Sequence, residues 1–159
     1  EAGLGHGPRY DVIAAWMVLE HLHDPVAALQ RLARWIKPGG WLALSVPNAS
    51  AWERAVFKDA WYALQGPTHL FHYTPRTLAA VLGQGGWRVK RLFHQRIVSN
   101  LFYSASYALA DRRPHSRLAR HLAALPEAGE KFNFAMYPFA LPLSALGQKG
   151  RMTVRARKQ

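Results

Sequence analysis

The chain lacks cysteine and has few carboxylates, with 9 Asp and Glu residues against 21 Lys and Arg residues among its 159. The absence of cysteine excludes disulfides and thiolate metal sites, and it is typical of proteins from a reducing cytoplasm. The start of the sequence shows neither a signal peptide nor a Met. We therefore expect a cytoplasmic protein of which this sequence is a fragment.

The shortage of acids leaves a formal net charge of +12. Such a charge favours an anionic partner, either nucleic acid or an anionic membrane surface. The most basic stretch contains Arg112, Arg113, Arg117 and Arg120. Few aromatic side chains lie among these arginines, so no specific nucleic-acid partner is evident. The other interpretation is that acidic residues outside this sequence balance the charge.

Long apolar runs are also absent. Residues 132–147 carry no charge, but the segment is shorter than the ~20 residues that span a bilayer, and Pro138 and Pro142 interrupt it. The pattern predicts a buried or interfacial helix, which leaves a membrane-peripheral location open. Because 50% of the residues are hydrophobic, the composition predicts a real core, and the length predicts one domain, 1–159.

The sequence does contain an apolar run, 12–18, that polar side chains follow at once. An unbroken run of this length predicts a strand that is buried on both faces of a parallel sheet. The polar residues that come directly after it are Glu20, His21, His23 and Asp24. Ligands of open α/β sheets bind at the carboxyl ends of the strands, so we expect this cluster to border a ligand crevice.

Helix and strand patterns alternate along the rest of the chain. Asp24-Pro25 predicts the start of a helix over 24–36. The sequence Lys-Pro-Gly-Gly at 37–40 ends that helix, and a second buried strand over 41–46 completes a right-handed parallel crossover. Further expected elements are short helices over 52–64, a loop over 65–73, a helix over 75–82 capped by Thr74, a strand over 87–94, two helices within 97–125 broken at Arg113-Pro114, and a strand over 150–158.

Three motifs resemble a known family. They are Tyr-Asp-Val-Ile at 10–13, Leu-Glu-His-Leu-His-Asp-Pro at 19–25, and Lys-Pro-Gly-Gly-Trp-Leu-Ala-Leu-Ser-Val-Pro-Asn at 37–48. In this order, with an amphipathic helix between the last two, they look like the second half of a class I S-adenosylmethionine-dependent methyltransferase. The nearest pattern is that of the ubiquinone-biosynthesis O-methyltransferases. The resemblance is good over 10–87 and weak beyond.

This resemblance implies an α/β fold with an incomplete Rossmann-like sheet of about four strands and helices on its faces. In this family the last strand runs antiparallel and returns between two earlier strands. The segment 97–147 is then a helical insertion before that strand. The domain 1–159 is partial and lacks the N-terminal half that carries the cofactor loop.

The resemblance also implies S-adenosylmethionine as the cofactor and methyl transfer to a small-molecule substrate as the reaction. The residues that match those packing on the methionine end of the cofactor are Ala15, Trp16, Met17 and Val18. Some relatives have a glutamate at the position of Met17, which with Glu20 and His21 resembles a divalent-metal site. Met17 lacks that carboxylate, so we expect no metal. Trp16 and Met17 can equally be ordinary core residues.

Methyl transfer to an alcohol or phenol requires a base as well as in-line placement of the two reactants. The base is expected at a strand end, where His21 is the first candidate. His69, in a loop that resembles the substrate lid of the family, is the second, and Glu20 is the third. Each histidine can instead have a purely structural role through a hydrogen bond.

Residues 3–7, Gly-Leu-Gly-His-Gly, match the glycine pattern of the cofactor loop. That loop requires a preceding strand and a following helix, whereas here a strand follows directly, so we expect a connector. Without the loop, the chain alone is expected to bind S-adenosylmethionine weakly and to be inactive. The strand over 11–18 also loses a neighbour, and its bare edge predicts a homo-oligomer.

Two other functions stay open at this point. One is a non-catalytic basic module that binds nucleic acid or an anionic membrane surface. The other is a degenerate methyltransferase-like subunit that supports an active partner. Neither the methyl acceptor nor the methylated atom follows from the sequence.

Overall fold

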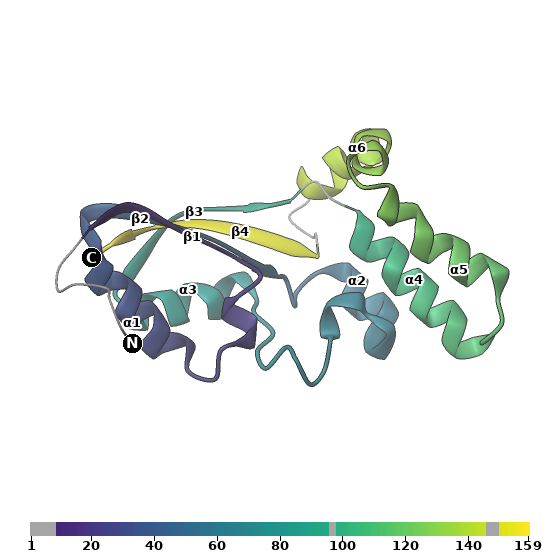
Figure 1. The fold of residues 1–159 in the computed structure, drawn as a ribbon, viewed down its shortest axis with the longest axis horizontal. Helices are drawn as coiled ribbons and strands as arrows, with labels where there is room; N and C mark the ends of the chain where they lie inside the picture. The colour runs from purple at the N-terminus through teal and green to yellow at the C-terminus, as the bar shows by residue number, and fades with distance from the viewer. Residues whose placement is uncertain (1–8, 96–97, 146–149) are drawn as a thin grey trace.

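The computed structural model describes residues 9–95, 98–145 and 150–159. The glycine-rich residues 3–7 lie outside these ranges. Figure 1 shows an elongated molecule, in which a sheet with two helices beneath it forms one half and a group of helices forms the other.

The strands of the sheet are β1 (Tyr10–Trp16), β2 (Ile36–Pro47), β3 (Trp87–His94) and β4 (Arg151–Lys158). They lie in the order β1-β2-β4-β3. β1 runs parallel to β2, and β4 lies antiparallel to both β2 and β3. The predicted fold class, a small α/β sheet whose last strand returns antiparallel between two earlier strands, is therefore confirmed.

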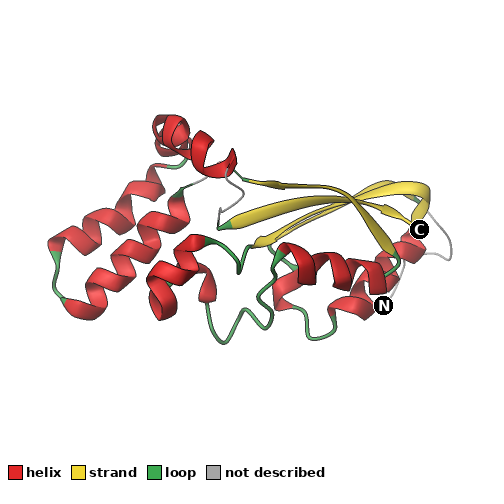
Figure 2. Cartoon of the chain, turned by 180° about the vertical axis from the view of Figure 1, so that it is seen from behind, coloured by secondary structure: helices red, strands yellow, loops and turns green. Residues whose placement is uncertain are grey.

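The two helices beneath the sheet are α1 (Pro25–Trp35), which connects β1 to β2, and α3 (Pro75–Gln84), which precedes β3. Both predicted N-caps are present. The side chain of Asp24 accepts a 2.9 Å hydrogen bond from the amide of Ala27, and Thr74 and Thr77 form a capping box. Both helices lie on the same face of the sheet, and in the described part of the chain no helix crosses the other face (Figure 1, Figure 2).

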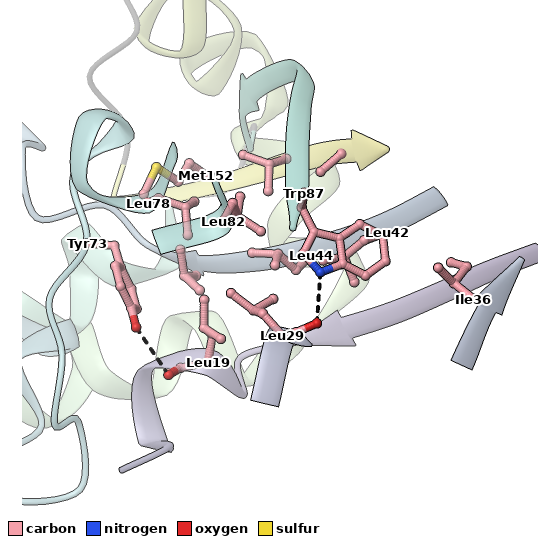
Figure 3. Close-up of a cluster of buried hydrophobic side chains, with 13 residues drawn as sticks. Leu19, Leu29, Ile36, Leu42, Leu44, Tyr73, Leu78, Leu82, Trp87 and Met152 are labelled. Atoms are coloured by element: carbon pink, nitrogen blue, oxygen red, sulfur yellow. Dashed lines mark hydrogen bonds between the residues drawn. The ribbon is translucent and has the colours of Figure 1, made fainter. Parts of the chain in front are cut away.

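The main core lies between these two helices and the covered face of the sheet (Figure 3). Side chains that alternate along the strands meet side chains that recur at helical spacing on α1 and α3. Trp87 of β3 is buried among them, and its indole Nε1–H donates a 3.0 Å hydrogen bond to the carbonyl of Leu29 on α1. Other members of this core are Leu42, Leu44, Val46, Leu78, Leu82, Met152 and Val154.

The prediction that the apolar run at 12–18 is buried on both faces is wrong. Ile13 and Ala15 are half-buried against the core, but the side chain of Val12 is 58% exposed and that of Trp16 is 53% exposed. The reason is the position of β1, which lies at the edge of a sheet whose helices cover one face. Alternate side chains therefore point to a face without a second layer.

The predicted boundary between the first helix and the second strand is also wrong. α1 ends at Trp35, and β2 begins at Ile36 rather than at Trp41. Tyr10 pairs with Ile36, while Val12 pairs with Trp41. Residues 37–40 therefore bulge out of the pairing between β1 and β2, opposite Asp11. Gly39 makes the turn with φ 73°, a value that glycine adopts without strain.

The helical half begins after β2. Its helices are α2 (Trp52–Phe57), the 3-10 helices η2 (Lys58–Ala60) and η3 (Tyr62–Leu64), α4 (Ser99–Arg112), α5 (Arg117–Ala124), the 3-10 helix η4 (Leu125–Ala128) and α6 (Glu130–Ala145). The predicted break at Arg113-Pro114 separates α4 from α5 and is confirmed. The predicted helix in the uncharged segment is present as α6, but it is not buried, since Phe134 is 85% exposed. Among the described helices, none has the length and hydropathy needed to cross a membrane.

Replacement of Trp87 by Phe should destabilise the fold. The variant loses the hydrogen bond to Leu29 and leaves a gap in the core, so the free energy of unfolding should fall by about 1–3 kcal/mol. Urea unfolding followed by circular dichroism measures this change. The matched control is Trp16→Phe, at an exposed indole, which should change the stability by less than about 0.5 kcal/mol. Equal losses in the two variants would contradict the assigned core.

Candidate active site

The end of β1 sets the position of the candidate site. Met17 follows β1 with φ 54°, in the left-handed region that residues other than glycine rarely adopt. Its amide donates a 2.9 Å hydrogen bond to the carbonyl of Ser45 on β2. The chain then forms the 3-10 helix η1 (Leu19–His21), which places Glu20 and His21 at the carboxyl end of β1.

A distant loop packs against η1. The amides of Leu70 and Phe71 donate hydrogen bonds of 2.9 and 3.2 Å to the carbonyl oxygen of Glu20. This contact brings His69 beside His21, with ring centroids 4.7 Å apart and ring planes inclined by 67°. The structure therefore places the first two candidate bases of the sequence side by side, and the third, Glu20, next to them.

Backbone carbonyls orient both imidazole rings. Nδ1 of His21 lies 3.0 Å from the carbonyl oxygen of Thr68, and Nδ1 of His69 lies 2.8 Å from that of Ala63. Because a carbonyl oxygen only accepts, each Nδ1 carries the hydrogen, and this assignment follows from the hydrogen-bond partners. In the neutral rings each Nε2 is left with its lone pair, which is the atom that a base or a metal ligand uses.

Glu20 is fully buried, and neither oxygen of its carboxyl group has a hydrogen-bond partner among the described residues. Burial raises the pKa of this carboxyl, and the charges of His21 and Arg151 oppose the rise in part. Burial, together with the nearby charge of Glu20, raises the pKa of Tyr73 to about 12. Tyr73 therefore stays a neutral phenol, and its O–H contacts the carbonyl of Leu19 at 3.5 Å.

His69 is the buried member of the histidine pair. Burial lowers its pKa, and the neighbouring rings of His21 and His72 lower it further, against the opposing effect of the hydrogen bond to Ala63. His69 is therefore a neutral acceptor near pH 7. His72 lies on the other side of His69, with ring centroids 6.2 Å apart, and its Nε2 lies 2.9 Å from the carbonyl oxygen of Leu64.

Among the described residues, Glu20, His21 and His69 could also hold a metal ion, because one ligand atom from each lies within 4.8 Å of the other two. Ligands about 2.1 Å from a tetrahedral ion are about 3.4 Å apart, so this spacing permits a cation without requiring one. A set of two imidazoles and one carboxylate suits zinc better than magnesium. The expectation of no metal, which depends on Met17, stays a prediction.

The residues predicted to contact the cofactor lie beside a groove. Ala15, Trp16 and Val18 line it, and Met17 does not. The groove has a volume of about 610 Å³ and runs between β1 and α1, with a mostly apolar lining that Asp24 and Arg31 interrupt. In the described ranges, no loop from a strand to the next helix contains glycine. The lining of this groove suits an apolar group.

A family model described as a methyltransferase domain matches residues 3–92, more than half of the chain. This match extends from residue 3 into β3 and includes both η1 and the loop that carries His69. The chain belongs to the class I S-adenosylmethionine-dependent methyltransferases. The predicted family is thereby confirmed.

Curated relatives of this methyltransferase chain include two ubiquinone biosynthesis O-methyltransferases. The protein of Nitrosomonas europaea is 36% identical over 70 residues, which cover 43% of this chain and 27% of the relative. That of Pectobacterium atrosepticum is 42% identical over 53 residues, which cover 32% of this chain and 22% of the relative. The chain thus matches about a quarter of the length of these relatives.

Solved structures show the same fold. The (4+2)-cyclase SpnF has a TM-score of 0.51 at 19% identity, covering 99% of this chain and 52% of that protein. An S-adenosylmethionine-dependent methyltransferase from Mesorhizobium loti has a TM-score of 0.50 at 15% identity, covering 99% of this chain and 65% of that protein. At these identities the likeness establishes the fold and not the reaction.

Sequence reasoning missed the partners that orient the histidines. The carbonyls of Thr68 and Ala63 carry no side-chain signal, and their roles follow from the path of the loop. The sequence also contains no sign that Tyr73 lies near Glu20. The run Gly-Pro-Thr-His at 66–69 is a turn signal that could have pointed to a tightly folded segment.

Replacement of His69 by Gln should remove a pH dependence of stability. The folded protein holds the pKa of His69 below 6.5, so the unfolded chain binds the proton more readily. Relative to the variant, the wild type should therefore lose stability as the pH falls from about 6.5 toward the lowered pKa, with a constant difference above that range. Urea unfolding of both proteins between about pH 8 and pH 5 measures this. Parallel stability curves would show that the ring is not held in its neutral form.

Proposed function

We propose that this chain forms the acceptor side of an S-adenosylmethionine-dependent O-methyltransferase whose substrate is a small molecule with a hydroxyl group. Membership of the methyltransferase family supports methyl transfer. The names of the curated relatives support oxygen as the methylated atom. The observation that carries the proposal is the histidine pair at the end of β1, in which a backbone carbonyl holds Nδ1 of each ring and no described residue takes up Nε2.

His21 is the proposed general base, because its side chain is exposed and a substrate can reach its Nε2. Nε2 takes the hydroxyl proton as the substrate oxygen bonds to the methyl carbon. The proton then leaves the exposed ring for water. S-adenosylmethionine, when bound, would supply the electrophilic methyl group and would keep the electron pair of the bond to that group on its sulfur. A base of this kind accelerates a reaction by roughly 10²–10⁴-fold.

Neighbouring groups support this role of His21. Thr68 holds Nδ1–H in place, so Nε2 keeps its direction. The carboxyl group of Glu20, when ionised, stabilises the imidazolium that forms, since the charges of Glu20 and His21 attract one another. His69 stays neutral beside the base, and a neutral neighbour does not oppose protonation of His21 as a cation would.

We infer that 1–159 is a partial methyltransferase domain with a helical insertion at 97–147. Ala15, Trp16 and Val18, which match family residues that pack on the methionine end of the cofactor, line the groove, and the described residues lack a glycine loop between a strand and the next helix. The chain alone should therefore be inactive. We also infer that no metal is required, because Met17 offers neither an oxygen nor a nitrogen ligand beside Glu20 and His21.

The test uses the protein encoded by the complete reading frame around this sequence. His21→Gln should lower kcat by roughly 10²–10⁴-fold toward a weakly acidic phenol or catechol acceptor, while calorimetry shows unchanged binding of S-adenosylmethionine. Turnover of the wild type should persist in EDTA. The chain 1–159 by itself should show no saturable binding of the cofactor.

The matched control is His23→Gln, an exposed histidine on the same segment, which should retain full activity. Full activity of His21→Gln would remove His21 from the reaction. A different result would assign Glu20, His21 and His69 to a metal ion. In that case EDTA would abolish turnover, and Glu20→Gln would abolish metal binding. Tight cofactor binding by the chain alone would contradict the inferred partial domain.

We further infer that β1 pairs with β1 of a second copy of the chain. In the described residues β1 pairs with β2 alone, and its free edge runs beside exposed Val12 and Trp16. An exposed apolar edge of this kind is a template for another strand. The groove between β1 and α1 extends the apolar surface next to that edge.

Light scattering of the purified chain should therefore give the mass of a dimer. Val12→Lys places a charge on the paired edge and should shift the mass to that of a monomer. Val56→Lys, at an exposed valine of α2, is the control and should leave the dimer intact. A monomer in the unmodified chain would refute the pairing.

A further inference from the structure

Arg151 is a half-buried cation at the end of the sheet that carries the histidine pair. It is the first residue of β4, and it pairs with Pro47, the last residue of β2. β4 runs antiparallel to β2, so its first residue lies at the end where the parallel strands β1 and β2 finish. Figure 1 shows β4 starting at the end of the sheet that adjoins the helical half. Ligands of α/β folds bind at this end of the sheet.

Hydrogen bonds fix the backbone on both sides of Arg151. Its carbonyl accepts a 3.1 Å hydrogen bond from the amide of Gln95, and the carbonyl of Gly150 accepts one of 2.9 Å from the amide of Asn48. The next residue, Met152, is buried in the core. Side chains alternate along a strand, so the side chain of Arg151 leaves β4 on the face opposite α1 and α3.

The guanidinium of Arg151 forms neither a hydrogen bond nor an ion pair with any residue in the described part of the chain. The phenol of Tyr62 and the carboxyl group of Glu20 are near enough for their charges to act on it. Burial lowers the pKa of Arg151, but an arginine stays protonated near pH 7. The carboxylate of Glu53 approaches Gly150 instead, where a Cβ would lie 2.6 Å from its Oε2. Proteins seldom leave a charge in such surroundings without a counter-ion, so this site suits an anion.

Tyrosine rings lie beside this cation. Tyr62 of η3 stacks on Tyr103 of α4, with ring centroids 4.7 Å apart and ring planes inclined by 22°. The ring centroid of Tyr107, one turn further along α4, lies 6.0 Å from that of Tyr62, and the side chain of Tyr107 is 45% exposed. Aromatic surfaces of this kind bind flat rings by stacking or by edge contacts. The groups around Arg151 therefore suit an anion that is carried on an aromatic ring.

The charges around Glu20 favour an anion with a single negative charge. The cations that act on Glu20 are His21 and Arg151. His21 is the proposed base, so Arg151 is the one that remains to hold a substrate. A guanidinium and a carboxylate match in shape, because two parallel N–H donors meet the two oxygens. A carboxylate therefore fits Arg151 better than a phosphate group, which carries more charge than one guanidinium balances.

We propose that Arg151 binds a carboxylate of the methyl acceptor, and that the acceptor is an aromatic hydroxy acid. Its ring lies beside Tyr62, and its hydroxyl group points to Nε2 of His21. An acceptor next to Glu20 is near both groups, since the charges of His21 and Arg151 both act on that carboxyl group. This inference rests on the proposed O-methylation and names its substrate class. A neutral phenol leaves Arg151 without a counter-ion and therefore binds less well.

Binding of protocatechuate and of catechol to the protein encoded by the complete reading frame tests the proposal, because the two compounds differ only in the carboxylate. Calorimetry should show protocatechuate bound roughly 10–100-fold more tightly than catechol, the range expected for a hydrogen-bonded charge pair. Arg151→Gln should abolish this difference and leave the affinity for catechol unchanged. Arg151→Lys should retain part of the difference, since an ammonium keeps the charge without the paired donors.

The matched control is Arg155→Gln, at an exposed arginine of the same strand, which should bind both compounds as the wild type does. Equal affinity of the wild type for the two compounds, or no detectable binding of either, would overturn the proposal. An Arg151→Gln variant that weakens both compounds alike would also overturn it, because Arg151 would then have a structural role. So would stronger competition by inorganic phosphate than by benzoate, which would assign Arg151 to a phosphorylated ligand.

Turnover separates this inference from the proposed function. In the wild type the KM of protocatechuate should be about tenfold or more below that of catechol, and Arg151→Gln should raise it with little change in kcat. Methylation of both compounds at equal KM would keep the O-methyltransferase and overturn the carboxylate site. A preference for protocatechuate that depends on Arg151, without methylation of either compound, would support the carboxylate site and reject the proposed reaction.

Discussion

The hydrogen bond between the amide of Met17 and the carbonyl of Ser45 ties the end of β1 to β2, and the candidate site depends on it. It turns the chain sharply enough for η1 to present Glu20 and His21 at the end of the sheet. The amides of Leu70 and Phe71 can then reach the carbonyl of Glu20. The core between α1, α3 and the sheet keeps β1 and β2 in register. The main fold therefore sets the geometry of the site.

Local sequence signals were sufficient for several parts of this arrangement. The N-cap at Asp24, the capping residue Thr74 and the strand over 87–94 depend on residues within a few positions of one another, and each is present. His21 and His69 could be selected as candidates by residue type and location. Their contact could not be predicted, because it results from a loop that folds back on η1 from far along the chain.

The wrong predictions share a physical origin. Alternation along a strand tells which side chains share a face, but not whether a second layer covers that face, and so Val12 was placed in a core that does not exist there. Similarly, Gly39 indicates a turn, but it does not indicate that β2 pairs with β1 both before and after that turn. The burial of Glu20 depends on tertiary neighbours in the same way. A fold shared with a cyclase also cannot define the reaction.

In the proposed reaction, the contact between His21 and Thr68 has a consequence for repeated turnover. Nδ1 carries a hydrogen in the neutral ring as well as in the imidazolium, so the carbonyl of Thr68 accepts the same bond in both states. The ring of His21 can therefore keep its orientation when Nε2 gains or loses a proton. A catalyst built in this way returns to its starting geometry by proton exchange alone, with no conformational reset between one substrate molecule and the next.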